Sequence, residues 1–272
     1  MPTRGAFIVI EGLDRSGKST QAAKLKEKLA ADGVKVELMK FPDRTTAIGK
    51  MIDAYLRTNI EMDDHVVHLL YSANRWELAS RISTLLTEGT TIICDRYAFS
   101  GIAFSASKVA STSASTTVTS TSSSTSTTAA PPTSTGSSTC GSSPTPAKTK
   151  DTCPTAKTTD TSPLLPYAWC RAPDIGLPAP DVTLFFDIAP EAARARGGYG
   201  EERYEREDVQ RRVMEVYARL GAEMEAARPG SWVRVDASRA VEEVAGAVWG
   251  VVAPLARGVE GEVGRLWEGP LA

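Results

Sequence analysis

The sequence has few of the side chains that metal centres and acid–base active sites use. It contains two histidines, His65 and His68, and its four cysteines include no C-x-x-C pair. Both histidines fall in a long predicted helix, where we interpret them as polar positions of that helix. Cys94 lies in an apolar segment, so we expect it to be a buried free thiol. This cysteine usage is typical of a reduced, intracellular protein.

Long apolar runs and an excess of one charge are also missing. No apolar run reaches the ~18 residues that a membrane span requires. The formal net charge is −2, so we expect no long-range attraction to nucleic acid or to acidic membranes. The first predicted strand begins at Phe7, which leaves no room for a secretory or transit signal. We therefore expect a cytoplasmic or nuclear protein that has neither nucleic acid nor a membrane as a partner.

The most informative stretch present is a phosphate loop near the N-terminus. Gly12, Gly17, Lys18 and Ser19 complete the pattern G-x-x-x-x-G-K-[ST] between an apolar β-branched run and a helix-forming segment. The glycines let backbone N–H groups point at a phosphate, and the helix that follows presents its positive end to the anion. The lysine adds a charge at the β- and γ-phosphates, and the serine hydroxyl is a ligand of Mg²⁺. In this context the pattern predicts a nucleotide site rather than a chance cluster.

Two further arginines follow predicted strands. Arg44 comes just after the strand predicted at residues 34–41, and Arg96 comes directly after a strand that ends in Asp95. Ligands bind at the carboxyl ends of the strands in open α/β sheets, and an aspartate there is positioned to approach Mg²⁺. One phosphate loop does not require these arginines, so they indicate a second phosphate site and a kinase whose acceptor is itself phosphorylated. Such an acceptor is ionised near neutral pH and needs no general base.

Predicted strands and helices alternate along most of the chain. Strands are predicted at residues 7–10, 34–41, 90–95, 181–187 and 232–236, and helices at 19–31, 45–58, 63–88, 190–196, 207–228 and 241–257. This alternation predicts an α/β fold with a doubly wound, five-stranded parallel sheet. We expect one kinase domain made of residues 1–108 and 164–257, with a Gly-rich lid at 196–205 and a C-terminal tail at 258–272.

Residues 109–163 do not follow this pattern. Sixteen of the eighteen residues from 111 to 128 are Ser or Thr, and a stretch rich in Pro, Thr and Lys follows. Because there is no apolar period and little to bury, we expect a disordered insertion, whose two cysteines do not make a metal site. It could be a tolerated surface-loop insertion, a linker, a modifiable tether or an unremoved intervening segment of the gene. Our hypothesis is that the domain folds normally around it, because loop-closure entropy grows only logarithmically with length.

Six blocks of the sequence resemble those of eukaryotic thymidylate kinases, in the same order. They are FIVIEGLDRSGKSTQAAKL, FPDRTTAIGKMIDAYL, HVVHLLYSANRWE, DRYAFSGIAFSASK, WCRAPDIGLPAPD and GYGEERYE. The resemblance covers about residues 7–108 and 167–255, and the combination of this phosphate loop with DRYAFSG is specific to the family. It implies a P-loop NTPase fold of the nucleoside monophosphate kinase type, a homodimer, and Mg²⁺-dependent transfer of the ATP γ-phosphoryl group to dTMP.

The resemblance also implies a role for each matching residue. The catalytic residues would be Asp14, Arg15, Lys18 and Arg96. The ATP-binding residues would be Gly12, Ser16, Gly17, Lys18, Ser19, Thr20 and Arg196. The dTMP-binding residues would be Asp14, Phe41, Arg44, Tyr71, Arg75, Arg96, Ser100, Gly101 and Tyr204. The Mg²⁺ ligands would be Ser19 and Asp95.

Several of these roles are specific. Asp14 would hold the 3′-hydroxyl of the acceptor sugar, and Arg15 would reach the transferring phosphoryl group, as in the branch that carries its catalytic arginine in the phosphate loop. Arg75 would hydrogen-bond the base. Tyr71 stands where the family commonly has a stacking Phe; a phenol can still stack, but its hydroxyl needs room.

Simpler interpretations exist for some of these side chains. Tyr71 could be a core aromatic residue, Arg75 a solvated arginine, and Arg96 a group that pins a turn. Arg203 and Glu205 fit a surface ion pair that contributes little. Three alternatives to dTMP kinase activity also stay open: a kinase of the same fold with another base preference, a P-loop switch or binding module, and a degenerate enzyme that serves as a scaffold.

Overall fold

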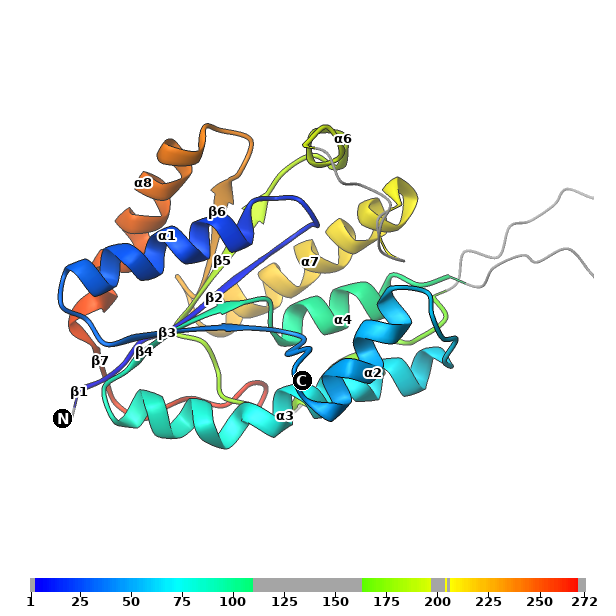
Figure 1. The fold of residues 1–272 in the computed structure, drawn as a ribbon, viewed down its shortest axis with the longest axis horizontal. Helices are drawn as coiled ribbons and strands as arrows, with labels where there is room; N and C mark the ends of the chain where they lie inside the picture. Colours follow the sequence, from blue (N-terminus) through cyan, green and yellow to red (C-terminus); the bar gives the residue numbers. More distant parts are fainter. Residues whose placement is uncertain (1–2, 110–162, 197–203, 205, 269–272) are drawn as a thin grey trace, which may run out of the picture. The chain divides into compact units, whose positions relative to one another are not determined.

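The computed structural model describes residues 3–109, 163–196, 204 and 206–268. Its centre is a five-stranded parallel sheet with the strand order β3-β4-β2-β5-β6 (Figure 1). The strands are β2 (Phe7–Gly12), β3 (Val36–Lys40), β4 (Thr91–Asp95), β5 (Val182–Asp187) and β6 (Trp232–Asp236). The predicted doubly wound α/β fold is confirmed.

Helices cover both faces of this sheet (Figure 1). They are α1 (Lys18–Ala31), α2 (Ala47–Leu56), α3 (Asp64–Thr87), α4 (Ala98–Ala106), α5 (Tyr167–Arg171), α6 (Pro190–Arg194), α7 (Glu207–Ala227) and α8 (Val241–Val252), with short 3₁₀ turns η1 (Ala172–Asp174) and η2 (Ala253–Arg257). Helices α1 and α8 pack together on one face, and α3, α4 and α7 lie on the other. None of the helices in the described part of the chain is long and apolar enough to cross a membrane.

Local chemistry explains where the helices begin and end. The carboxylate of Asp63 accepts a hydrogen bond from the backbone N–H of His65, which caps α3 as predicted. Gly89 lies just beyond the end of α3 with φ 83°, a conformation that glycine adopts without strain. The last helix is shorter than predicted: it stops at Val252, because Pro254 has no N–H to continue the α-helical pattern and a 3₁₀ turn follows.

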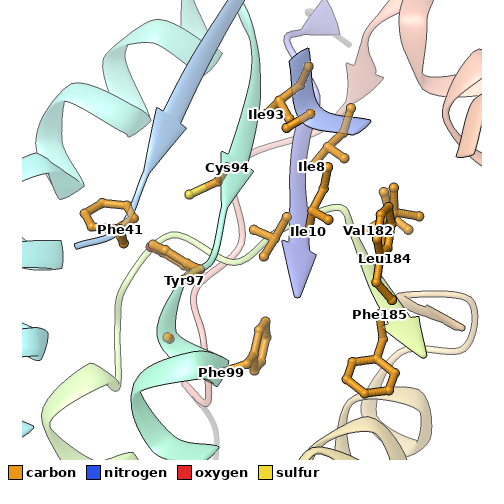
Figure 2. Packing of buried hydrophobic residues seen from close by; sticks show 14 of the residues in the cluster. Ile8, Ile10, Phe41, Ile93, Cys94, Tyr97, Phe99, Val182, Leu184 and Phe185 are labelled. Carbon is orange, nitrogen blue, oxygen red and sulfur yellow. The ribbon is translucent and has the colours of Figure 1, made fainter. Parts of the chain in front are cut away.

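The central strands are apolar because neighbours cover them on every side. All six residues of β2 are buried, and this strand pairs with both β4 and β5. Figure 2 shows Ile8 and Ile10 of β2 beside Val182 and Leu184 of β5. Such full burial is the reason that parallel strands appear as continuous apolar runs rather than alternating ones. Cys94 is a free, buried thiol in this core, as predicted, and burial raises its pKa well above the usual value.

The two ends of the described chain meet in a small second sheet. Strand β1 (Thr3–Arg4) pairs antiparallel with β7 (Val259–Glu260), and Arg4 forms a bidentate ion pair with Asp181 just before β5, at 2.7 and 2.8 Å. Further along, Leu266 is buried and Trp267 packs edge-on against Phe99. Residues 259–268 therefore pack on the domain that contains the five-stranded sheet, although nothing in the sequence predicted this. The domain boundary placed at residue 257 stays a prediction.

The residues that flank the Ser/Thr-rich stretch lie next to each other. Val109 and Pro163 form an isolated antiparallel bridge, and the N–H of Leu164 donates to the carbonyl of Lys108 at 2.8 Å. The described residues on both sides belong to one compact unit. The predicted disorder of the insertion, most of the predicted lid, and the Arg203–Glu205 pair lie outside the described residues.

This stem gives a direct test of whether the insertion is tolerated. Replacing residues 110–162 by Asn-Gly is expected to change kcat/KM by less than about threefold, because a two-residue turn can join antiparallel neighbours. A coupled assay of the ADP release that the family resemblance implies measures this, with a Gly/Ser linker of equal length as the control. A large loss in the shortened chain but not in the Gly/Ser control would show that the two bridged residues need a longer connection. A large change in both would show that the segment itself acts on the site.

The structure corrects the interpretation of one histidine. His65 is exposed, but His68 is fully buried. Its Nε2 lies 2.8 Å from the carbonyl oxygen of Cys170, which can only accept, and its Nδ1 lies 2.8 Å from Ser105 Oγ. Nε2 therefore carries a proton, which it donates to this carbonyl. Burial, reinforced by the charge of Arg75, lowers the pKa of His68 to about 4.

We expect His68 to make stability pH-dependent. Its pKa rises to about 6.5 in the unfolded chain, so below that pH the unfolded state binds a proton that the folded state does not. The free energy of unfolding should consequently fall by up to about 3 kcal/mol between pH 6.5 and 4 because of this group. Urea denaturation across this range should show a shallower dependence for His68→Gln, and an unchanged one for the exposed control His65→Gln. Equal dependence in all three proteins would contradict the assignment.

Candidate active site

The phosphate loop joins β2 to α1, and its glycines have structural reasons. Gly17 adopts φ 91° immediately before the first helical residue, Lys18. Gly12 adopts φ 142°, and a Cβ there would lie 2.6 Å from the carbonyl oxygen of Phe186 on the neighbouring strand. At Gly17 the backbone adopts a conformation that is rare for other residues. At Gly12 the two neighbouring backbones approach so closely that no side chain fits between them. The loop therefore opens towards the N-terminus of α1, as the sequence predicted.

Lys18 is a buried cation at the base of this loop. Its ammonium donates to the carbonyl of Leu13 and, at 3.2 Å, to Ser16 Oγ. Burial and the nearby charge of Arg96 together lower the pKa of Lys18 to about 7, although Asp14 and Asp95 oppose the shift. A phosphate group beside it would restore the charged form, since an anion favours the protonated amine.

Asp95 and Ser19 meet at the carboxyl end of β4. The Ser19 hydroxyl donates to Asp95 Oδ2 at 2.5 Å, while Asp95 Oδ1 is buried without a hydrogen-bond partner. Burial raises the pKa of Asp95, but Lys18 and Arg96 outweigh this and hold it below its usual value. An ionised carboxylate with an unpaired oxygen beside a hydroxyl fits a Mg²⁺ ligand pair.

Arg96 and Asp14 form the second charged pair of the site. The Arg96 guanidinium contacts one oxygen of Asp14, and it also donates to the carbonyl of Gly12 at 3.2 Å and to Ser100 Oγ at 3.3 Å. The backbone of Arg96 is left-handed, with φ 67°, which is uncommon for a residue with a side chain. Gln210 of α7 donates to the other oxygen of Asp14 at 2.9 Å. No sequence motif indicated Gln210, because it lies 196 positions from Asp14 along the chain.

A buried glutamate that sequence reasoning missed supports this region. Glu11 has no exposed surface, and its carboxylate accepts from the backbone N–H groups of Tyr97 and Ser100 at 2.9 and 3.1 Å. It also accepts from the hydroxyls of Ser100 and Tyr217. Glu11 thus accepts hydrogen bonds from backbone N–H groups at the N-terminus of α4, where the N-cap residue Tyr97 makes no capping hydrogen bond through its side chain. A lone charged residue in an otherwise apolar strand was the available signal.

Arg75 is neither solvated nor exposed, contrary to the simpler interpretation. It is 2% exposed and forms a two-pronged ion pair with the fully buried Asp174, at 3.1 Å from Nε and 2.6 Å from Nη2. Ser72 donates to the same carboxylate at 2.7 Å. Gly101 makes room for the guanidinium, since a Cβ there would lie 2.8 Å from it. Asp174, in η1, was not predicted as a site residue.

Two other predicted arginines also have protein partners. Arg44 donates to Asp53 of α2 at 2.7 Å, and Asp53 also accepts from Arg57 at 2.9 Å. Arg196 donates to the carbonyls of Arg15 at 3.3 Å and Ala237. Arg196 therefore lies beside the phosphate loop, and contacts within the chain hold both Arg44 and Arg196 in place.

One cavity of about 430 Å³ collects most of the predicted residues. Its lining includes Asp14, Arg15, Gly17, Lys18, Ser19, Thr20, Phe41, Arg44, Tyr71, Arg75, Asp95, Arg96, Ser100, Gly101 and Tyr204. Three predicted residues do not line it, namely Gly12, Ser16 and Arg196. The cavity also has lining residues that were not predicted, among them Lys40, Tyr97 and Phe104.

The site defines a P-loop phosphotransferase. It combines a phosphate loop with an Asp–Ser pair at the end of the neighbouring strand, and further arginines line the same cavity.

A family model described as thymidylate kinase matches residues 10–123 and 163–248. The thymidylate kinase of Arabidopsis thaliana is 42% identical over 241 residues, 89% of this chain and 68% of the relative. The human thymidylate kinase is 36% identical over 241 residues, 89% of this chain and 86% of its own.

A solved structure agrees with these sequence matches. The thymidylate kinase of Candida albicans has a TM-score of 0.70 and 31% identity, with 97% of this chain and 99% of that chain covered. The chain belongs to the thymidylate kinase family. It is accordingly a phosphotransferase with ATP as the donor, and its activity is phosphorylation of dTMP.

Proposed function

We propose that the cavity holds ATP phosphates and dTMP together, with the transfer taking place beside Lys18 and Arg96. The observation that carries this is a continuous series of contacts across one cavity. Arg96 pairs with Asp14 and donates to Ser100, and the neighbouring Gly101 faces the Arg75 guanidinium. These contacts support a fixed relation between the phosphate loop and Arg75, which would bind the base.

The proposed mechanism depends on position and charge. The acceptor phosphate is already ionised, so no group has to remove a proton. Lys18 and Arg15 would neutralise charge on the transferring phosphoryl group, and Arg44 and Arg96 would bind the acceptor phosphate. Asp14 would accept a hydrogen bond from the sugar 3′-hydroxyl of the acceptor, and Tyr204 would lie near that sugar. On the donor side, Arg196 would pack on the adenine. The loop residues that would bind ATP are Gly12, Ser16, Gly17, Ser19 and Thr20.

We infer that Asp95 and Ser19 hold Mg²⁺. The unpaired Oδ1 of Asp95 and the adjacent hydroxyl are oxygen ligands of the kind that this ion prefers. Bound there, Mg²⁺ would stabilise negative charge on the donor phosphates. The described residues contain no group of three or more His, Cys, Asp and Glu side chains able to hold a metal, so phosphates and water would supply the other ligands.

Base recognition would come from the far end of the cavity. Arg75 would hydrogen-bond thymine while Asp174 fixes its orientation, and Phe41 and Tyr71 would line the ring. A coupled assay with ATP against dTMP, dUMP, UMP, CMP, AMP and GMP tests this assignment. We expect turnover with dTMP and weak turnover with dUMP. Turnover with UMP or CMP at a similar rate would show a different base preference, and ATP binding without any turnover would favour a switch or scaffold.

We also propose that the chain forms a homodimer through α3. Val66, Leu69 and Trp76 are 48, 47 and 41% exposed, and their spacing places them along one side of the helix. Light scattering should give twice the chain mass, and Leu69→Glu should give the monomer. The same charge at Val241 of α8, which is 49% exposed, is the control. A monomeric parent protein would refute the interface.

The cytoplasmic or nuclear location stays a prediction.

A further inference from the structure

Lys40 is a lysine in the active-site cavity to which the sequence assigned no role. It is the last residue of β3, the edge strand, and its register partner on β4 is Asp95. Adjacent parallel strands point paired residues to the same side of the sheet. The sheet itself therefore brings this ammonium to the carboxylate that we assign to the metal.

The contacts of Lys40 overlap with those expected of a metal ion. Its ammonium lies 3.4 Å from Asp95 Oδ2 and 3.3 Å from Ser19 Oγ. Lys18 donates its hydrogen bonds to Leu13 and Ser16, and Arg96 contacts Asp14, although the charges of both also favour the ionised form of Asp95 and lower its pKa. Lys40 thus forms an ion pair with Asp95.

We propose that Lys40 competes with free divalent cations for Asp95 and Ser19, so that the metal enters as the metal–nucleotide complex. The proposal rests on the metal role proposed for these two residues. A dication and an ammonium at one carboxylate repel each other. A free ion that displaces Lys40 would gain two protein ligands, the Asp95 carboxylate and the Ser19 hydroxyl. An ion bound to ATP also brings the ATP phosphates, which give the displaced Lys40 ammonium a new ionic partner.

A simpler interpretation is a surface ion pair of little consequence. The Lys40 side chain is 59% exposed, and exposed pairs contribute little to stability. Competition with a metal is a different quantity, because it depends on charge at the binding site rather than on the stability of the fold. Metal affinity without nucleotide therefore separates the two interpretations.

The test is a titration of the full chain with Mn²⁺ in the absence of nucleotide. The electron paramagnetic resonance signal of free Mn²⁺ measures how much of the ion is bound. Lys40→Met is expected to lower the Kd for Mn²⁺ about three- to tenfold. Lys40→Arg, which keeps the charge, should stay within about twofold of the parent. Lys35→Met removes an exposed lysine from the same segment and should also have no effect.

Asp95→Asn separates failure of this proposal from failure of the metal assignment. If Asp95→Asn leaves Mn²⁺ binding unchanged, the metal role of Asp95 is wrong, and the proposal fails with it. If Asp95→Asn weakens binding but Lys40→Met does not strengthen it, the metal site stands and competition by Lys40 is refuted. Tighter binding by both Lys40→Met and Lys35→Met would show a general charge effect and would also refute it.

Discussion

Replacing Arg96 by lysine is expected to lower kcat/KM for dTMP by about 10²- to 10³-fold. The guanidinium contacts Asp14, Gly12 and Ser100 at once, and its planar fork suits both a carboxylate and a phosphate. A lysine keeps the charge but has a single compact ammonium, which cannot reach all of these partners. Because the contacts lie on the acceptor side, affinity for ATP should change little.

Steady-state kinetics with varied dTMP, together with fluorescence titration of ATP binding, measure the two effects. The matched control is Arg81→Lys, because Arg81 forms an exposed ion pair with Glu37 at 2.6 Å and does not line the cavity. A variant within fivefold of the parent would show that Arg96 pins the turn after β4 instead of binding the acceptor phosphate. A matching loss of ATP affinity would place its role on the donor side.

Removing the carboxylate of Asp174 should have the largest effect on stability. Asp174→Ala leaves the guanidinium of Arg75 buried and without its partner, and breaking a buried pair in this way typically lowers the free energy of unfolding by about 3–5 kcal/mol. KM for dTMP should also rise, because Arg75 loses the group that orients it. Urea denaturation and steady-state kinetics measure the two effects.

The double variant Arg75→Met with Asp174→Ala separates structure from recognition. Two apolar side chains no longer leave a buried charge, so much of the stability should return, whereas weak dTMP binding should persist. Recovery of both properties would show that Arg75 does not contact the base. Asp208→Ala, which removes exposed ion pairs between Asp208 of α7 and the side chains of Arg206 and Arg212, is the control for stability.

The parts of the fold that the sequence predicted are those set by local chemistry. The phosphate loop, the apolar strands and the cap at Asp63 each depend on residues close together in the chain. The end of α8 was placed five residues too late, because the pattern of apolar residues continues into η2 although Pro254 ends the α-helix. Pairing of Thr3–Arg4 with Val259–Glu260 could not be inferred, since two-residue strands have no periodicity.

The candidate site shows the same division. Contiguous motifs indicated Lys18, Asp95 and Arg96, all of which line the cavity. Other groups at the site come from distant segments: Gln210, which donates to Asp14, is 196 positions away from it, and strand register brings Lys40 to Asp95. Burial likewise arises from packing, which is why His68 looked like an ordinary polar helix position.

The adjoining positions of Val109 and Pro163 have a consequence for how the chain could be divided. A cut within 110–162 would leave two pieces that share one sheet, because β2 of the first piece pairs with β5 of the second. The cavity would draw Lys18 and Arg96 from one piece and Tyr204 from the other, with Asp174 of the second piece holding Arg75 of the first. Two halves that are expressed separately should thus regain phosphotransfer only when they reassociate. The activity of the enzyme would then report directly on the association of the two fragments.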